Sequence, residues 1–378
     1  MIVDVKEDIK VVIGMSEEKI VLVPVSNLMA GMVAARDVYS RNDQLLIPKD
    51  SVINNKMITR ITFFGIMSVS VYANDMVEQQ IQQEDLENEY MSPEEKKEFI
   101  EFKKNYDLTV SNIMKNMNQL LKADEEIDQV KLVEDVDKLV FKSRSKYHIF
   151  DMLHNIKTFD DETYRHCLNV AMINNVFADW LGMNEYEKNH LTMCGLLHDV
   201  GKLLIDKNVL RKPARLTEDE YEEIRQHPMR GYQSLKDKKI PESVKRAVLL
   251  HHERCDGKGY PFGFKTSEID PYVEITAIAD VYEAMTATRV YRKGMSPFDV
   301  IRIFEEDGKK QFNPIFLVPL LNNMTNTYLQ HEVVLSNGMS GKIVLINQNE
   351  LSRPTILLNN GTLFDLSKER EVNITEVH

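Results

Sequence analysis

The chain has 378 residues, of which 43% are hydrophobic, so it is long enough to fold as about two or three domains with a sizeable core. The formal net charge of −12 argues against non-specific binding to DNA, RNA or an anionic membrane surface. No run approaches the roughly 20 apolar residues of a membrane span, and residues 1–10 lack the apolar core of a signal peptide, so we expect a cytoplasmic protein without a nucleic-acid or membrane partner.

Residues 1–75 predict a small N-terminal α+β domain. Runs rich in Val and Ile at 19–25 and 67–72 are typical of strands. Residues 54–64 have a helical pattern between those runs, and Gly65 follows as a C-cap. Because this segment holds no histidine and no cluster of acids, we interpret it as a regulatory or packing module.

Residues 76–145 are charged and polar, with almost no Gly or Pro, and predict a helical linker. A helix is expected to start at Pro93, because Pro suits the first helical position and acids follow in the first turn. Ile113, Met117 and Leu120 then recur at helical spacing. The apolar face of this helix packs either on its own chain or on a second copy, so a homodimer through the linker is one of two arrangements that we expect.

Residues 146–328 are predicted to form successive helices around the doublet His198-Asp199, which follows the apolar pair Leu196-Leu197. An ionisable doublet in such a run is costly to bury unless it is paired or bound to a cation. An ion pair between Asp199 and Lys202 would meet this requirement, and so would a metal ion.

Further potential metal ligands lie on both sides of this doublet. Upstream, Glu162 and His166 are four residues apart and therefore share one face of a helix. Downstream, the candidates lie close to carboxylates or at the edge of apolar segments, and they are His227, His251, His252 and Asp280. Imidazoles with carboxylates, and no cysteine in the set, suit a hydrolytic metal centre that holds iron, manganese or zinc-like ions.

This ordered set resembles the HD superfamily of metal-dependent phosphohydrolases. The segment over residues 251–261, which begins with His-His-Glu and ends in Gly-Tyr-Pro, is similar to the HD-GYP subfamily, and the resemblance extends from about residue 149 to residue 316. HD-GYP proteins are known as bacterial phosphodiesterases that open the second messenger cyclic di-GMP. The resemblance implies an all-helical HD-type catalytic domain over residues 146–328.

The family pattern implies two or three divalent metal ions, which we expect to be iron or manganese. The implied ligands are Glu162, His166, His198, Asp199, His227, His251, His252 and Asp280. Glu162 matches an acidic position of members that hold three metals instead of two. Two ions bridged by Asp199 would lower the pKa of a shared water, and the resulting hydroxide would attack phosphorus.

Asp199 and Lys202 are therefore the expected catalytic residues. On a continuing helix Lys202 would lie on the same side as His198, where its ammonium group would bind a phosphate oxygen or help to protonate the leaving group. Flexible backbone, an aromatic ring and nearby cations also suit contacts with a nucleotide. The expected substrate-binding residues are Lys202, Gly259, Tyr260, Pro261, Arg289, Arg292 and Lys293.

A few positions depart from the usual family pattern. Glu283 and Asn313 stand where Asp is common, and Val290 stands where Pro is frequent. None of these changes removes an implied ligand, so they bear on the shape of the substrate pocket and on the metal count.

Residues 329–378 predict a small C-terminal β module. Strand-like runs at 331–335, 341–346 and 354–358 are separated by Asn-Gly turns at 337–338 and 360–361. The whole chain is therefore expected to be multidomain and mainly α, with small modules on both sides of the catalytic domain.

Together these observations predict a metal-dependent phosphodiesterase that hydrolyses cyclic di-GMP to linear pGpG, and the end product, pGpG or GMP, stays open. Two alternatives stay open. One is a cyclic dinucleotide receptor that binds without turnover, and the other is a phosphodiesterase for another cyclic dinucleotide such as cyclic GMP-AMP. Retention of every implied ligand favours an enzyme, because a pure receptor could lose several of them.

Overall fold

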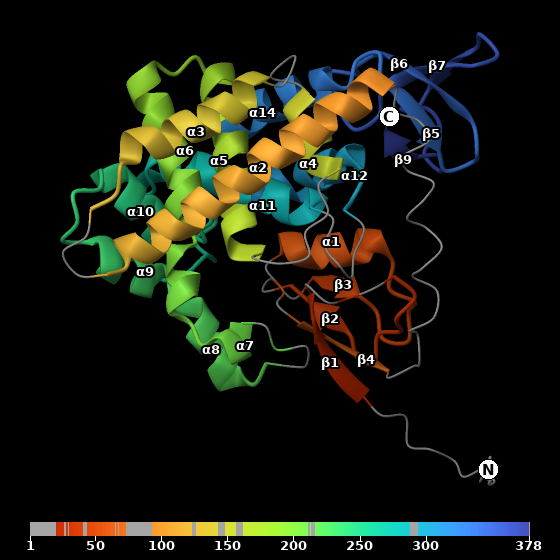
Figure 1. Ribbon diagram of the computed structural model, residues 1–378. Helices are drawn as coiled ribbons and strands as arrows, with labels where there is room; N and C mark the ends of the chain where they lie inside the picture. Colours follow the sequence, from red (N-terminus) through yellow and green to blue (C-terminus); the bar gives the residue numbers. More distant parts are fainter. Residues whose placement is uncertain are drawn as a thin grey trace, which may run out of the picture.

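The structure is a computed structural model, and it is mainly helical with strands toward both ends (Figure 1). It describes residues 20–25, 28, 30–40, 44–64, 66, 68–72, 93–122, 126–142, 148–155, 162–210, 212, 216–287 and 294–377. Within these ranges, no helix is both long enough and apolar enough to cross a bilayer.

The N-terminal part combines short strands with one helix. The elements are β1 (Ile20–Pro24), β2 (Val38–Tyr39), β3 (Leu45–Ile47), α1 (Asn55–Phe63) and β4 (Ser68–Tyr72). β1 pairs antiparallel with β4, and β2 pairs antiparallel with β3. Ile47, Ile58 and Ile61 are fully buried in a core of their own. Because α1 also contacts helices of the main body, this small core lies against that body.

Three helices form the centre of the main body: α5 (Glu162–Trp180), α6 (Glu185–Leu197) and α11 (Pro271–Thr286). α5 and α6 approach closely, since a Cβ on Gly195 would lie only 2.6 Å from the Cα of Ala171. Asn174 is buried and donates hydrogen bonds to the carbonyl oxygen of Leu191 at 2.9 Å and to Thr276 Oγ1 at 3.0 Å. This amide therefore ties the three helices together by satisfied buried hydrogen bonds.

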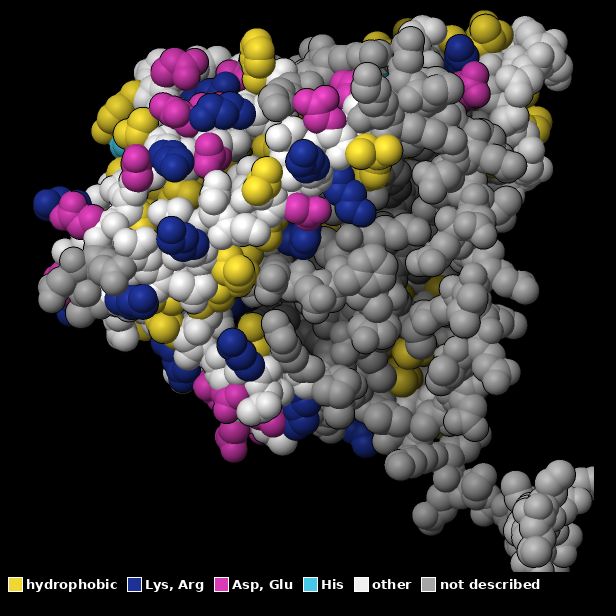
Figure 2. Space-filling model, viewed as in Figure 1, with side chains coloured by type: hydrophobic (Ala, Val, Ile, Leu, Met, Phe, Trp, Pro, Cys, Tyr) yellow, Lys and Arg dark blue, Asp and Glu magenta, His cyan; other side chains and the backbone are white. Residues whose placement is uncertain are grey.

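Two further helices, α2 (Pro93–Leu120) and α3 (Gln129–Lys142), lie across this centre (Figure 1). Phe102 and Val136 are buried in the same core as the side chains of α5. Tyr106 is fully buried and donates a hydrogen bond to Asn169 Oδ1 at 2.7 Å. On the outside, acidic, basic and hydrophobic side chains are interspersed (Figure 2). The apolar face of α2 thus packs on its own chain, which is one of the two expected arrangements.

The other helices surround the centre, and all of them except α14 are short. They are α4 (His148–Asn155), η2 (Val200–Leu204), α7 (Lys207–Leu210), α8 (Glu218–Arg225), α9 (His227–Leu235), α10 (Glu242–Leu250), η3 (Thr266–Glu268), α12 (Pro297–Ile303), η4 (Phe304–Gly308), α13 (Lys309–Gln311) and α14 (Pro314–Thr327). α7 and α8 project from the body (Figure 1) and share a small core of Ile205, Leu216 and Ile224.

The C-terminal part is a five-stranded antiparallel sheet of order β8-β7-β6-β5-β9. Its strands are β5 (Glu332–Leu335), β6 (Ser340–Leu345), β7 (Thr355–Leu358), β8 (Leu363–Asp365) and β9 (Ile374–Val377). Gly338 and Gly361 have φ of +83°, as the predicted Asn-Gly turns require. β8 and β9 were not expected, because both are short and mix apolar with polar residues.

Candidate metal centre

The doublet His198-Asp199 lies at a break between helices. α6 ends at Leu197, and after Asp199 the chain continues as the 3₁₀ helix η2. We expected a helix over residues 184–205 with a break near Gly201, and the break lies a few residues earlier, so Lys202 is on η2 and not on a continuation of α6. Asp199 has φ −100° and ψ 10°, in the sparsely populated region where many active-site residues lie. Both side chains of the doublet are buried.

Gly201 allows η2 to lie directly against α9. A Cβ at this position would lie 1.9 Å from the carbonyl oxygen of His227 and 2.8 Å from the backbone nitrogen of Gly231. No other residue fits such a contact without moving the backbone. This close approach places Asp199 beside His227.

We expect Gly201→Ala to lower the free energy of unfolding by about 1–3 kcal/mol, the usual cost of overpacking, and to reduce the metal bound per chain. The reason is that η2 must move away from α9. Denaturant unfolding and elemental analysis measure the two effects. Gly182→Ala is the control, because Gly182 has φ +70° and no described atom lies within 4 Å of an added Cβ. This variant therefore strains the backbone without a steric clash and without moving η2. Wild-type stability and metal content in Gly201→Ala would contradict the close contact.

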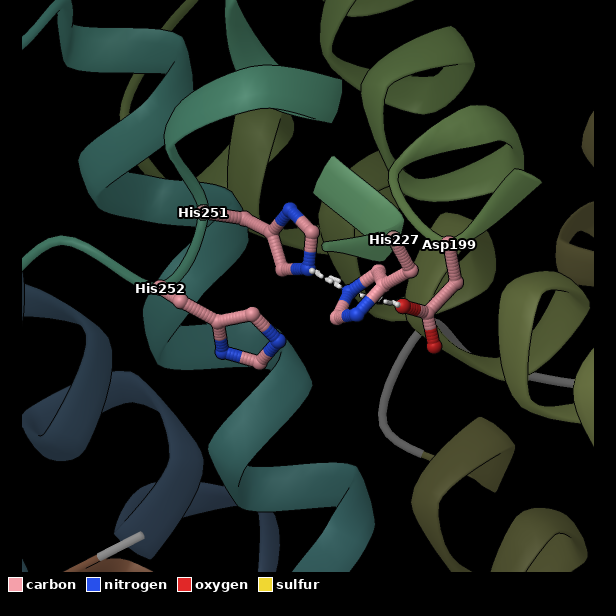
Figure 3. A group of neighbouring side chains, drawn as sticks. All are labelled: Asp199, His227, His251 and His252. Carbon is pink, nitrogen blue, oxygen red and sulfur yellow. Dashed lines mark hydrogen bonds and ion pairs between the residues drawn. The ribbon is translucent and has the colours of Figure 1, made fainter. Parts of the chain in front are cut away.

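One group of potential ligands consists of Asp199, His227, His251 and His252, whose ligand atoms all lie within 4.8 Å of one another (Figure 3). His227 begins α9, and His251 and His252 follow the last residue of α10. Asp199 Oδ1 lies 3.2 Å from His227 Nε2 and 3.6 Å from His251 Nε2. Helix ends separated in the sequence therefore deliver these side chains to one point.

A second group consists of His166, His198 and Asp280. His166 comes from α5 and Asp280 from α11, and His166 Nε2 lies 3.1 Å from Asp280 Oδ1. The other carboxylate oxygen of Asp199, Oδ2, lies 3.4 Å from His166 Nε2 and 3.6 Å from His198 Nε2. Asp199 thus faces the first group with Oδ1 and the second group with Oδ2.

The hydrogen bonds of the imidazoles determine which nitrogen carries the proton. His198 Nδ1 donates to the carbonyl oxygen of Gly195 at 2.8 Å, and His227 Nδ1 donates to that of Ile224 at 2.7 Å. His251 Nδ1 likewise faces backbone carbonyls. A carbonyl oxygen only accepts, so in each neutral ring Nε2 keeps its lone pair.

The Nε2 atoms converge. His227 Nε2 lies 3.3 Å from His251 Nε2, and His198 Nε2 lies 3.2 Å from His166 Nε2. Among the described residues, the buried Oδ1 of Asp199 has no hydrogen-bond partner. Converging lone pairs and an unpaired buried carboxylate oxygen are what divalent cations require as ligands, so the residues present fit a metal centre.

Burial and neighbouring charges shift the pKa values of these imidazoles. Burial lowers the pKa of His198 to about 3, and burial together with His251 and His227 lowers the pKa of His252 well below its usual value. Neutral imidazoles are the form that binds metals. For His166, burial alone would lower the pKa, but the carboxylates of Glu283 and Asp280 outweigh it and raise the pKa to about 10. A bound cation would take the place of that proton.

Lys202, on η2, lies next to the ligand groups because its side chain contacts Asp199. Its Nζ donates to Asp199 Oδ2 at 2.5 Å, and its side chain is 26% exposed. Burial alone would lower the pKa of Lys202, but the negative charges of Asp199 and Asp280 raise it, so the ammonium group stays charged. The ion pair expected as one explanation of the doublet is thus present beside the converging imidazoles.

The Gly-Tyr-Pro loop packs on the first group. The ring of Tyr260 stacks on His252 with a centroid distance of 4.5 Å and an interplanar angle of 22°. A Cβ on Gly259 would lie 2.4 Å from the Cα of Glu253. Glycine is therefore needed at this position for the loop to close on its own backbone.

Comparison with known proteins agrees with this geometry. Residues 130–315 match the family model described as an HD domain, and the described ligand groups lie within that range. The chain belongs to the HD-GYP family. The HD-GYP motif at Gly259-Tyr260-Pro261 follows the His251-His252 pair in this chain.

Curated relatives of this HD-GYP protein include named enzymes. Cyclic di-GMP phosphodiesterase PA4108 of Pseudomonas aeruginosa is 36% identical over 155 residues, covering 41% of this chain and 37% of the relative. Cyclic di-GMP phosphodiesterase PdeB of Borreliella burgdorferi is 28% identical over 209 residues, covering 55% of each chain. 3'3'-cGAMP-specific phosphodiesterase 1 of Vibrio cholerae is 37% identical over 145 residues, covering 38% and 34%. The HD-GYP chain thus spans between 34% and 55% of the length of these relatives.

Some residues expected at the HD-GYP site lie outside the described part of the structure. Glu162 is the first residue of α5, four residues before His166, but its side chain lies outside the described part of the structure. Arg289, Arg292 and Lys293 also fall outside the described residues. Their proposed roles remain predictions.

Glu283 is a site residue that the sequence analysis noted only as a departure from the HD-GYP pattern. It is buried, and it accepts a hydrogen bond from His166 Nδ1 at 2.6 Å and another from Asn169 Nδ2 at 2.8 Å. Its carboxylate thereby orients His166 with Nε2 toward the second group. The signal in the sequence was its position one helical turn after Asp280.

Glu253 is a second residue that the sequence analysis missed. Its buried carboxylate, 3% exposed, accepts hydrogen bonds from the backbone nitrogens of Phe262 at 2.7 Å, Gly263 at 3.2 Å and Phe264 at 3.0 Å. It therefore holds the HD-GYP loop closed over His252. Its place directly after the His-His pair was the only signal.

We expect Glu253→Gln to loosen this loop and to lower the free energy of unfolding by about 1.5–3 kcal/mol, the value of hydrogen bonds to a charged group. The glutamine amide must present a donor to backbone N–H groups that are donors themselves. Hydrogen exchange at the amides of Phe262 and Phe264 should accelerate. The control is Glu268→Gln, since Glu268 accepts from the backbone nitrogen of Lys265 at 3.0 Å in an exposed turn. Equal protection of the loop amides in wild type and Glu253→Gln would refute this role.

Proposed function

We propose that this HD-GYP protein hydrolyses cyclic di-GMP to linear pGpG and then pGpG to GMP, with two or three iron or manganese ions at the site. The observation that carries this proposal is the Asp199 carboxylate, whose oxygens face separate groups of imidazole nitrogens. The relatives from Pseudomonas aeruginosa and Borreliella burgdorferi are named cyclic di-GMP phosphodiesterases, which supports this substrate.

The side chains of this site have separate tasks in such a reaction. Bound divalent ions would supply an activated water and offset the charge of the phosphodiester. In the reaction, the water oxygen bonds to phosphorus, the bond from phosphorus to the ribose O3′ breaks, and O3′ leaves with a proton. Lys202 stays charged next to Asp199, so its ammonium group would bind a phosphate oxygen or supply that proton.

The proposal is tested with protein purified without oxygen and analysed for its metal content. Incubation with cyclic di-GMP should yield linear pGpG by chromatography, a chelator should abolish the product, and added Mn²⁺ or Fe²⁺ should restore it. Metal-loaded protein that forms no linear product under reducing conditions would contradict the proposal.

A cyclic GMP-AMP phosphodiesterase is the second candidate, because one relative from Vibrio cholerae is named a 3'3'-cGAMP-specific phosphodiesterase. Values of kcat/KM on cyclic di-GMP and on 3'3'-cyclic GMP-AMP separate the two substrates. Tight binding without hydrolysis of either would instead support a receptor.

A further inference from the structure

The helix α8 directs two long side chains toward the Gly-Tyr-Pro loop. Tyr221 and Arg225 are four residues apart on α8 and therefore share one face of it. The guanidinium carbon of Arg225 lies 4.7 Å from the ring centroid of Tyr260 and 5.9 Å from that of Tyr221. A positive charge is thus held against two aromatic rings, and such contacts strengthen when they are shielded from water.

This cation lies at the rim of the metal centre. Arg225 precedes His227 by two residues, and the ring of Tyr260 stacks on the imidazole of His252. Both histidines belong to the first ligand group. The contacts from Arg225 to Tyr260 and from Tyr260 to His252 therefore connect the guanidinium to the ligand group through one ring.

The donors of Arg225 are only partly used. Nη1 lies 3.3 Å from Glu222 Oε2, but the Glu222 side chain is 60% exposed, and such surface pairs contribute little. Among the described residues, Nε of Arg225 is buried without a hydrogen-bond partner. A buried guanidinium donor without an acceptor is unfavourable, and an oxyanion is the acceptor that matches its geometry.

A cyclic dinucleotide brings two phosphodiester anions in one ring, and only one of them can be cleaved at a time. The chain carries a net charge of −12, so a second anion requires a local cation. Lys202 is already paired with Asp199 at the centre. We propose that Arg225 binds the phosphate of the substrate that is not being cleaved. This inference rests on the proposed function and extends it to a substrate-binding residue on α8.

The test compares substrates with and without a second phosphate. Arg225→Met keeps the apolar stem between the aromatic rings and removes the charge. It should raise KM for cyclic di-GMP and for pGpG by about 10- to 100-fold, as expected for a lost hydrogen bond to a charged group, with little change in kcat. For GpG, which lacks the 5′-phosphate, KM or the competitive inhibition constant should stay the same. Arg225→Lys keeps the charge but lacks the planar guanidinium group, so its KM for cyclic di-GMP should lie between the values of wild type and Arg225→Met.

Arg230→Met is the matched control, because Arg230 lies on the neighbouring α9 and already donates to Leu204 O and to Glu223. It removes the same charge and should leave KM unchanged. Metal content and thermal unfolding should match wild type in all three variants.

An unchanged KM in Arg225→Met overturns the inference and leaves the proposed function intact. An equal rise in KM or in the inhibition constant for GpG also overturns the inference, because Arg225 would then contact a base or affect the metal centre. Wild-type protein that neither binds nor hydrolyses cyclic di-GMP overturns both proposals.

Discussion

Asp199→Asn is expected to lower turnover of cyclic di-GMP by more than about a hundredfold and to reduce the metal bound per chain. Loss of a residue that only orients a metal ligand costs about 10- to 100-fold. Asp199 is placed between both ligand groups, so its loss should exceed that range. Asparagine keeps the shape of the side chain but presents an amide, which is a poor ligand next to converging imidazoles. Product chromatography and elemental analysis measure the two effects.

Asp206→Asn serves as the control for this variant. Asp206 follows η2 and accepts a hydrogen bond from the backbone nitrogen of Asn208 at 2.8 Å in an exposed position. The substitution removes the same charge from the same segment and should leave metal content and turnover unchanged. Asp199→Asn protein with full metal content and wild-type turnover would rule out a role of Asp199 as a metal ligand.

Glu283→Gln is expected to weaken metal binding at the second group by about 10- to 100-fold, the cost of removing an orienting carboxylate. Both partners of Glu283, His166 Nδ1 and Asn169 Nδ2, are donors. A glutamine amide satisfies one of them and opposes the other. Asn169 cannot turn its amide without cost, because its Oδ1 already accepts from Tyr106. A titration with Mn²⁺ that is followed by electron paramagnetic resonance should show weaker binding of the ion at the second group.

Glu274→Gln is the matched control for Glu283→Gln. Glu274 is a buried acid on the same helix, and it accepts from Asn313 Nδ2 at 3.0 Å, away from the ligand groups. It should affect stability without changing the metal titration. Identical Mn²⁺ titrations for wild type and Glu283→Gln would show that His166 needs no support from Glu283.

The interaction between Glu283 and Asn169 also explains why α2 matters for the site. Tyr106 of α2 donates to Asn169, Asn169 donates to Glu283, and Glu283 accepts from His166. A buried chain of hydrogen bonds thus runs from α2 to the second ligand group. The charged composition of residues 76–145 predicted a linker, and this chain was not visible in it because its members are far apart in the sequence.

Local patterns predicted most elements of the fold. Pro93 begins α2, and the apolar spacing that follows it corresponds to the buried face of that helix. The Asn-Gly turns lie where the sequence indicated. A break near Gly201 was expected in a helix over residues 184–205, and α6 ends a few residues earlier, at Leu197. The close contact of Gly201 with His227 on another helix is not visible in the local sequence pattern.

The sequence by itself determined which side chains are available as metal ligands, since the order and spacing of the histidines and aspartates carry the HD-GYP resemblance. Only the tertiary structure decided how they are used. It turns Nδ1 of His198, His227 and His251 toward backbone carbonyls and Nδ1 of His166 toward Glu283. It also directs the oxygens of Asp199 to different groups and places Glu253 and Arg225 nearby. Hydrogen bonds and ion pairs depend on direction and distance between residues up to a hundred or so positions apart, and a linear pattern carries neither quantity.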